Sequence, residues 1–126
     1  MTTPSSPPGP GPGAGPALTV SVTEQNAVVT VTVAGELDVS TVPAFNKELS
    51  ELRQNSATTL VLDLSGTTFM DSTGLSAVLV AEMHARMRGQ RFKVVAGPPH
   101  VHELFKLTGV DNFLDVVGPD DAAADN

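Results

Sequence analysis

The stretch "LVLDLSGTTFMDSTGLSAVL", residues 60–79, decides how this chain folds. Its aliphatic start belongs to "TTLVLDLS", residues 58–65, which is typical of a strand buried on both faces, as in parallel sheets. Its end opens "LSAVLVAEMHARMRG", residues 75–89, which has the apolar periodicity of a helix that stops at Gly89. The small polar cluster "DSTG", residues 71–74, therefore lies after a buried strand and a short loop and before a largely apolar helix.

The sequence before this stretch predicts a hairpin and a helix. Residues 17–35 alternate β-branched residues with Ser and Thr on both sides of "EQNA", which indicates two strands and a turn. Residues 35–55 carry apolar side chains at helical spacing, and either Ser40 or Thr41 is suited to cap the start of that helix.

The sequence after the stretch continues the alternation. "RFKVVAG" predicts a strand, "PPHVHELFKLTG" a short helix that stops at Gly109, and "FLDVV" a last strand. The order β-β-α-β-α-β-α-β predicts an α/β fold with a mixed, partly parallel sheet and helices packed on it.

Composition divides the 126 residues into one folded unit and two tails. Residues 1–16 are almost entirely Pro, Gly, Ser, Thr and Ala, so they lack the large apolar groups that offset the entropy of ordering. We expect a disordered tail there, a folded domain over residues 17–117, and an acidic, flexible tail over residues 118–126.

Charge and hydropathy exclude several classes of function. The formal net charge of −7 argues against direct binding to nucleic acid, which needs a basic face, and against an anionic membrane surface. We find no apolar run of about 18 residues and no leader peptide, so we expect neither a membrane span nor secretion, and place the protein in the cytoplasm.

Nothing in the chain indicates a catalytic, cofactor or metal site. Cysteine is absent, and His84, His100 and His102 lack a second cluster of ligands, so no metal is expected. Ser72 lacks the preceding glycine of the G-x-S-x-G frame of serine hydrolases, and the chain contains neither a phosphate-binding P-loop nor a dinucleotide-binding motif. We expect no enzymatic activity and no cofactor.

The polar cluster has two interpretations. In the structural one, Asp71 caps the helix, Ser72 and Thr73 belong to its first turn, and Gly74 lets a neighbouring element approach closely. In the functional one, two hydroxyl groups beside an apolar helix face form a docking surface with a modifiable centre. The residues alone leave both open.

Three segments together resemble the anti-sigma factor antagonist family, the small STAS-domain proteins of bacterial partner-switching systems. They are "GELD" at 35–38, "LVLDLSGTTFMDSTGLSAVL" at 60–79 and "LFKLTGV" at 104–110, and they span nearly the whole predicted domain in the family's order. The resemblance implies a STAS fold and a role in the regulation of transcription, with stress response as one setting.

The resemblance also implies site residues and partners. The serine after the Asp of the motif, here Ser72, is the family's phosphoacceptor, with Thr73 as a less favoured second candidate. The implied kinase is the anti-sigma factor itself, an ATP-dependent serine kinase, and a metal-dependent serine phosphatase reverses the reaction. The implied partner-binding surface contains Asp38, Asp71, Ser72, Thr73, Gly74 and Leu75.

The implied function is an antagonist whose unphosphorylated form binds the anti-sigma factor and frees the sigma factor, and whose phosphorylation ends that binding. The alternatives are a STAS scaffold or a ligand-binding module within a stress-signalling assembly. For Asp38, simple capping of the following helix is an alternative to partner contact. One departure is that many members end in a further helix, whereas residues 113–126 here are mostly small and acidic.

Overall fold

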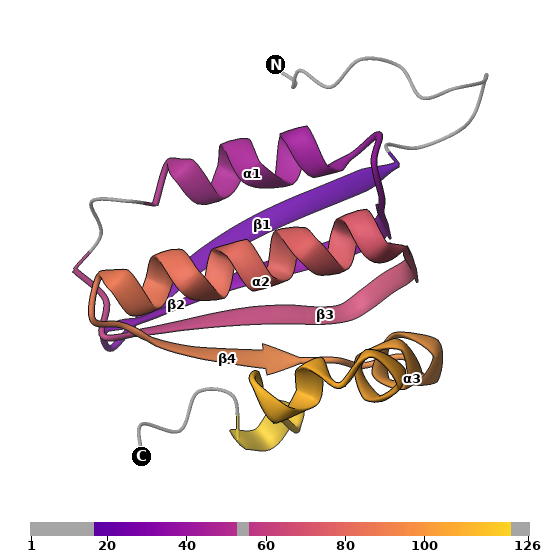
Figure 1. Ribbon diagram of the computed structural model, residues 1–126. Coiled ribbons are helices and arrows are strands. Elements are labelled where there is room, and N and C mark those ends of the chain that lie inside the picture. Colours follow the sequence, from indigo (N-terminus) through magenta and orange to yellow (C-terminus); the bar gives the residue numbers. More distant parts are fainter. Residues whose placement is uncertain (1–16, 53–55, 122–126) are drawn as a thin grey trace.

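The computed structural model describes residues 17–52 and 56–121 and contains one five-stranded sheet in the order β1-β2-β3-β4-β5 (Figure 1). β1 runs antiparallel to β2, and every other neighbouring pair is parallel. The elements are β1 (Leu18–Gln25), β2 (Val28–Leu37), α1 (Val42–Ser50), β3 (Thr59–Met70), α2 (Ser72–Met87), β4 (Arg91–Val95), α3 (Pro99–Thr108), the 3-10 helix η1 (Val110–Asn112), β5 (Asp115–Val117) and the 3-10 helix η2 (Pro119–Asp121).

This order confirms the predicted α/β class and the mixed, partly parallel sheet. The predicted N-terminal tail, residues 1–16, lies outside the described residues, as does the predicted C-terminal tail apart from Gly118 and η2. The proposed boundaries of the domain therefore stay predictions. Within the described part of the chain, no helix combines the length and the apolar character that a membrane span requires.

The hairpin closes through a tight turn at Asn26 and Ala27. Gln25 pairs with Val28, and the two residues between them have φ values of 53° and 65°. Two successive positive φ angles are the signature of a type I′ turn, whose twist matches that of paired antiparallel strands. Asn tolerates this conformation well, whereas Ala adopts it rarely.

β3 is longer than the sequence predicted. We expected a strand over residues 58–65 and a loop before Asp71, but the strand continues to Met70. Pairing with β2 sustains it through two shifts in register, one between Thr32 and Ala34 and one between Gly35 and Glu36. Such bulges bend a strand and change which residues face inward, and Asp71 therefore follows a strand directly.

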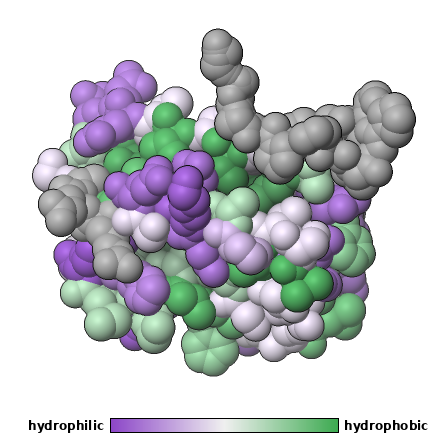
Figure 2. Space-filling model, turned by 90° about the horizontal axis from the view of Figure 1, so that it is seen from above, coloured by the Kyte–Doolittle hydropathy of each residue, from purple (hydrophilic) through white to green (hydrophobic). Residues whose placement is uncertain are grey.

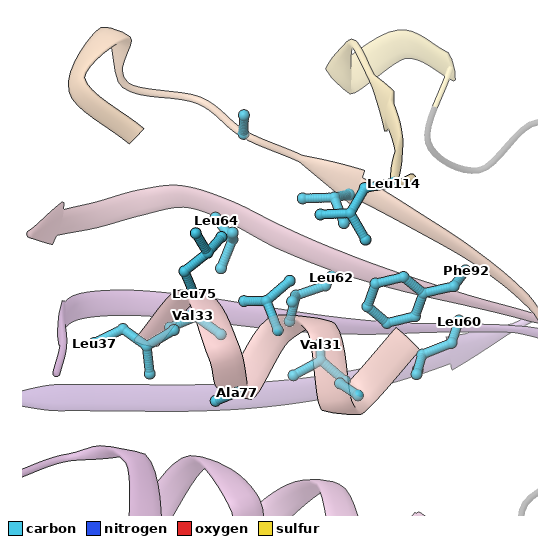
Figure 3. Close-up of a cluster of buried hydrophobic side chains, with 14 of the residues drawn as sticks. Val31, Val33, Leu37, Leu60, Leu62, Leu64, Leu75, Ala77, Phe92 and Leu114 are labelled. Atoms are coloured by element: carbon cyan, nitrogen blue, oxygen red, sulfur yellow. The ribbon is translucent and has the colours of Figure 1, made fainter. Parts of the chain in front are cut away.

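The main core lies between one face of the sheet and the three helices (Figures 1 and 3). Because side chains alternate across a strand, every second residue of the inner strands points into it. Phe45 of α1, Val78 of α2 and Phe105 of α3 are fully buried against this set. The strands supply Val29, Val31, Val33, Leu37, Leu60, Leu62, Leu64, Phe92 and Val94, among others.

The opposite face of the sheet has a smaller cluster formed by Val28, Val61 and Val95, with Val117 packed against it. Val95 of β4 pairs with Val117 of β5 on one side and with Asp63 of β3 on the other. The cluster residues of β4 and β5 are therefore direct partners, whereas those of β3 and β4 are not. The two clusters together explain why the central strand reads as a continuous aliphatic run.

α1 has the amphipathic character that its spacing predicts. Phe45 is buried, while Lys47 and Glu51 lie on the solvent side, with 3.9 Å between Nζ and Oε2. Figure 2 looks down on the molecule from the α1 side of Figure 1, and hydrophilic and hydrophobic residues are interspersed over that face. Exposed ion pairs of this kind contribute little to stability.

Gly74, in the first turn of α2, lies against the end of β2. A Cβ atom at this position would come within 2.2 Å of the carbonyl oxygen of Leu37 and 3.0 Å of its carbonyl carbon. Because the obstructing atoms belong to backbone, a larger residue could be accommodated only if the helix and the strand moved apart. The predicted close approach of a neighbouring element at Gly74 is thus confirmed.

We expect the substitution Gly74→Ala to lower the free energy of unfolding by about 2 kcal/mol, because the clash outweighs the better helix propensity of alanine. Urea denaturation followed by circular dichroism measures this change. Gly118→Ala is the matched control: a Cβ there meets nothing within 4 Å, so we expect a change below about 0.5 kcal/mol. Equal stability of the two variants would contradict this account of the α2–β2 contact.

Candidate functional site

The site forms where two strands end side by side. Leu37 of β2 pairs with Met70 of β3, and the amide of Asp71 lies 3.4 Å from the carbonyl oxygen of Leu37. The chain leaves these strands through two connections, residues 38–41 into α1 and Asp71 into α2. Both connections lie at the right-hand end of the sheet in Figure 1. The topology therefore brings "GELD" and "DSTG" to one edge.

Asp71 is the N-cap of α2. Its backbone is extended, and its Oδ1 accepts a hydrogen bond of 3.0 Å from the amide of Gly74. The Asp71 carbonyl oxygen accepts from the amide of Leu75 at 2.9 Å. These bonds confirm the capping interpretation of Asp71 and satisfy groups that the first turn of a helix leaves unpaired.

Ser72 is the most accessible residue of the polar cluster. It is exposed at the first position of α2, and its hydroxyl makes no hydrogen bond within the part of the chain that the structure describes. Thr73 is half-buried. The hydroxyl that a partner or an enzyme would reach first therefore belongs to Ser72.

Gly74 and Leu75 lie beneath this surface. Gly74 packs on Leu37, and Leu75 is 6% exposed and belongs to the main core, where Figure 3 shows it beside Val33 and Leu64. We predicted both as partner-binding residues. Their position gives them the role of holding the helix start in place, so the contact surface proposed below consists of the exposed residues only.

Asp38 organises the connection between β2 and α1. Its Oδ1 accepts hydrogen bonds from the hydroxyl of Ser40 at 2.7 Å, from the amide of Ser40 at 3.0 Å and from the amide of Thr41 at 3.3 Å. The hydrogen bond from the Ser40 hydroxyl, with those from the two amides and from the Thr41 hydroxyl, lowers the pKa of Asp38, while partial burial opposes the shift.

Thr41, and not Asp38, occupies the N-cap position of α1. Its hydroxyl does not cap the helix: it donates to the carbonyl oxygen of Glu36 at 2.7 Å and accepts from the amide of Asp38 at 3.0 Å. The predicted position of a cap at Ser40 or Thr41 is correct, but the hydroxyl fastens the loop to the end of β2. The loop-closing roles of Ser40 and Thr41 escaped the sequence analysis, although an Asp followed by Ser and Thr is a known turn signal.

This edge of the sheet is a small acidic surface around the neutral hydroxyl of Ser72. Asp38 and Asp71 flank Ser72 from two connections, and their carboxylate oxygens accept hydrogen bonds from their own loops. Among residues 17–52 and 56–121, no group of three or more His, Asp or Glu side chains comes together in a way that could hold a metal ion.

A separate cavity of about 240 Å³ lies between the C-terminal halves of α1 and α2, far along both helices from Ser72. Its lining is mixed, with Leu49, Leu60 and Val80 as apolar members and His84 and Arg88 as basic ones. Its lining contains none of the residues predicted as site residues.

We expect a measured pKa of Asp38 below that of an ordinary aspartate, and a pKa nearer the ordinary value in the Ser40→Ala variant, where the shortest hydrogen bond is lost. Because the pKa in the folded chain is the lower one, ionised Asp38 favours the ordered loop above the unfolded-chain pKa. This contribution is lost as the pH falls through the folded-state pKa. NMR titration of the Asp38 carboxyl carbon measures both values.

Ser50→Ala is the control for this titration, because the Ser50 hydroxyl donates to the Lys47 carbonyl, within α1 and away from Asp38. It should leave the pKa of Asp38 unchanged. If Ser40→Ala also left that pKa unchanged, the hydrogen bond that Ser40 donates would not be the cause of the lowered pKa of Asp38.

Comparison with known proteins gives a consistent result. The family model described as "Mlab, STAS domain" matches residues 20–118. The anti-sigma-F factor antagonist RsfB of Mycobacterium tuberculosis is 32% identical over 94 residues, which cover 75% of this chain and 76% of that protein. The anti-sigma-B factor antagonist of Staphylococcus aureus is 28% identical over 99 residues, covering 79% of this chain and 92% of that protein.

The crystal structure of an anti-sigma factor antagonist from Mycobacterium paratuberculosis superposes with a TM-score of 0.75 at 31% identity, covering 83% of this chain and 90% of that one. The sheet, the helices and the relatives thus agree with the resemblance that the three sequence segments suggested. The chain belongs to the STAS-domain family of anti-sigma factor antagonists.

Proposed function

We propose that this protein is a phosphorylation-controlled anti-sigma factor antagonist and that Ser72 is its switch. The observation that carries the proposal is the state of the Ser72 hydroxyl, which is exposed at the start of α2 and makes no hydrogen bond to the described residues, while its neighbours are engaged in the fold. The names of the relatives support an anti-sigma factor as the partner. In its unphosphorylated form the protein binds that partner, and the sigma factor is released.

Ser72 is favoured over Thr73 by its accessibility. A kinase must reach the hydroxyl oxygen in line with the γ-phosphorus of ATP, and Thr73 is half-buried in the first turn of α2. The transfer forms the bond between the Ser72 oxygen and phosphorus, breaks the bond from the γ-phosphorus to the ADP oxygen, and passes the hydroxyl proton to a base of the kinase. This protein supplies the substrate hydroxyl and no catalytic group.

The phosphate would act on the interface more than on the fold. It adds a charge of about −1.5 to −2 at neutral pH, and a helix N-terminus accommodates such a group with its free amides. A partner that covers Ser72 would instead have to remove water from the dianion, which lies beside Asp38 and Asp71. Any acidic group of the partner at this position would add repulsion between like charges. A loss of about 3 kcal/mol corresponds to more than a hundredfold in affinity, so no refolding is required.

The cycle needs two enzymes, neither of which is this protein. The kinase is an anti-sigma factor with ATP-dependent serine kinase activity, and a metal-dependent serine phosphatase restores the unphosphorylated form. Both act where ATP and RNA polymerase are present, which places the protein in the cytoplasm.

The direct test is incubation with ATP and a candidate anti-sigma factor kinase, followed by intact-mass and peptide mass spectrometry. We expect one phosphate, on Ser72, that is absent from Ser72→Ala and retained in Thr73→Val. Ser76→Ala is the matched control, because Ser76 is an exposed serine one turn further along α2. Calorimetry should show the phosphorylated form binding the kinase at least about a hundredfold more weakly than the unmodified form.

Treatment with a metal-dependent serine phosphatase should restore binding, and chelation of the metal should prevent this. If no candidate kinase adds a phosphate, while Ser72→Ala binds an anti-sigma factor as the wild type does, the switch is wrong and a scaffold role is favoured. A phosphate on Thr73 alone would move the switch to that residue.

A further inference from the structure

Two hydrophobic side chains are exposed at the same edge of the sheet as Ser72. Val39 is 69% exposed and Phe69 is 47% exposed. Val39 lies in the connection after β2, directly after Asp38, and Phe69 is the second-last residue of β3, two residues before Asp71. We call them the Val39–Phe69 pair.

The sheet register determines where the pair lies. Phe69 is the partner of Glu36, and the next two residues, Met70 and Leu37, are partners in the core. Val39 is therefore two residues beyond the last paired position of β2, and Ser72 is two residues beyond the last paired position of β3. Val39 and Ser72 thus follow the ends of two adjacent strands, and Phe69 lies three residues before Ser72, on the face of the sheet opposite to that of Leu37 and Met70.

The exposure of both residues is enforced by their neighbours. Met70 and Leu37 take the inward positions, and the register shift before Glu36 leaves Phe69 outside with it. The loop around Val39 is held by the hydrogen bonds that Ser40 and Thr41 donate to Asp38, which stabilise the conformation in which Val39 is exposed. An apolar group held in water by a hydrogen-bonded frame is available for burial against another protein.

We infer that the Val39–Phe69 pair is the apolar anchor by which this protein binds the anti-sigma factor kinase, an inference that rests on the proposed function. The matching surface on the kinase is an apolar recess bordered by Lys or Arg. The basic border follows from charge complementarity, because Glu36 and Asp38 lie beside the two anchors and the whole chain carries a net charge of −7.

The Val39–Phe69 pair and Ser72 have different roles in binding. Burial of Val39 and Phe69 supplies affinity that is the same before and after phosphate transfer, whereas Ser72 decides whether the interface can close. Loss of an anchor is therefore loss of uniform binding, which raises KM for phosphorylation and leaves kcat unchanged.

The other exposed aromatic of the described chain provides a matched control. Phe113 is 79% exposed and lies near Glu82, Arg86 and Phe92, close to the C-terminal half of α2 and the start of β4. It is at the opposite end of α2 from Ser72. Its removal takes away more exposed aromatic surface than the removal of Phe69, without touching the proposed contact.

The test uses full-length protein and the anti-sigma factor kinase that phosphorylates the wild type. We prepare Val39→Thr, which keeps the β-branched shape and removes one apolar methyl, Phe69→Ala, and Phe113→Ala. By calorimetry we expect Kd to rise about tenfold or more for Phe69→Ala and severalfold for Val39→Thr, and to stay within about twofold for Phe113→Ala. Phosphorylation kinetics should show a raised KM and an unchanged kcat for the first two variants.

Circular dichroism and urea denaturation on every variant show whether the fold is kept, and because the two side chains are exposed we expect it to be. If the wild type binds and is phosphorylated but all three variants bind equally well, the anchor is wrong and the switch stands. If kcat falls for Phe69→Ala while KM is unchanged, the residue does not act as an anchor. If the wild type is neither bound nor phosphorylated, the proposed function fails, and this inference with it.

Discussion

The site depends on one close approach between main chains, that of the first turn of α2 to the end of β2. At Gly74 a side chain would overlap the carbonyl of Leu37, and the amide of Asp71 lies within 3.4 Å of the same oxygen. No side chain separates the helix from the strand, so the distance between the two connections is set by backbone geometry. The exposed groups at this edge are consequently held in a fixed relation to each other, which is what a kinase needs of a substrate that it must also bind.

The two aspartates of the site have different structural tasks. Asp71 turns its carboxylate toward the amides of its own helix, and Asp38 turns its carboxylate toward its own loop. Each thereby rigidifies one side of the surface while it keeps a negative charge there. The local order and the negative field around Ser72 therefore have the same origin, and a change of either aspartate alters both.

Much of the fold could be predicted because several independent signals agreed. The alternation in β1 and β2, the stripe around Phe45 and the aliphatic run of β3 each indicate an element by themselves, and their order leaves few topologies. The cap at Asp71 and the close approach at Gly74 followed from local chemistry. The exposed position of Ser72 agrees with the interpretation of "DSTG" as a surface with a modifiable hydroxyl group.

The missed features depend on contacts between elements distant in the sequence. The extension of β3 through "GTTFM" rests on bulged pairing with β2, and neither strand signals these bulges alone. The same register shifts leave Phe69 outside, where simple alternation gives no indication of its direction. Leu75 was predicted as a partner-binding residue because it belongs to the motif, and the rotation of α2 directs its side chain into the core. Partner contact depends on such details of rotation and register more than on proximity in sequence.

The parallel pairing of β2 with β3 also has a consequence for the order of folding. The β1–β2 hairpin involves only neighbouring residues, but β2 and β3 meet after the chain has crossed over through α1, and pairings of this kind are slow. Asp38 and Ser72 reach the same edge only when that crossover is complete. A nascent or partly unfolded chain contains the serine but not the assembled surface around it. Under the proposed function, the kinase would therefore recognise only chains whose folding is complete.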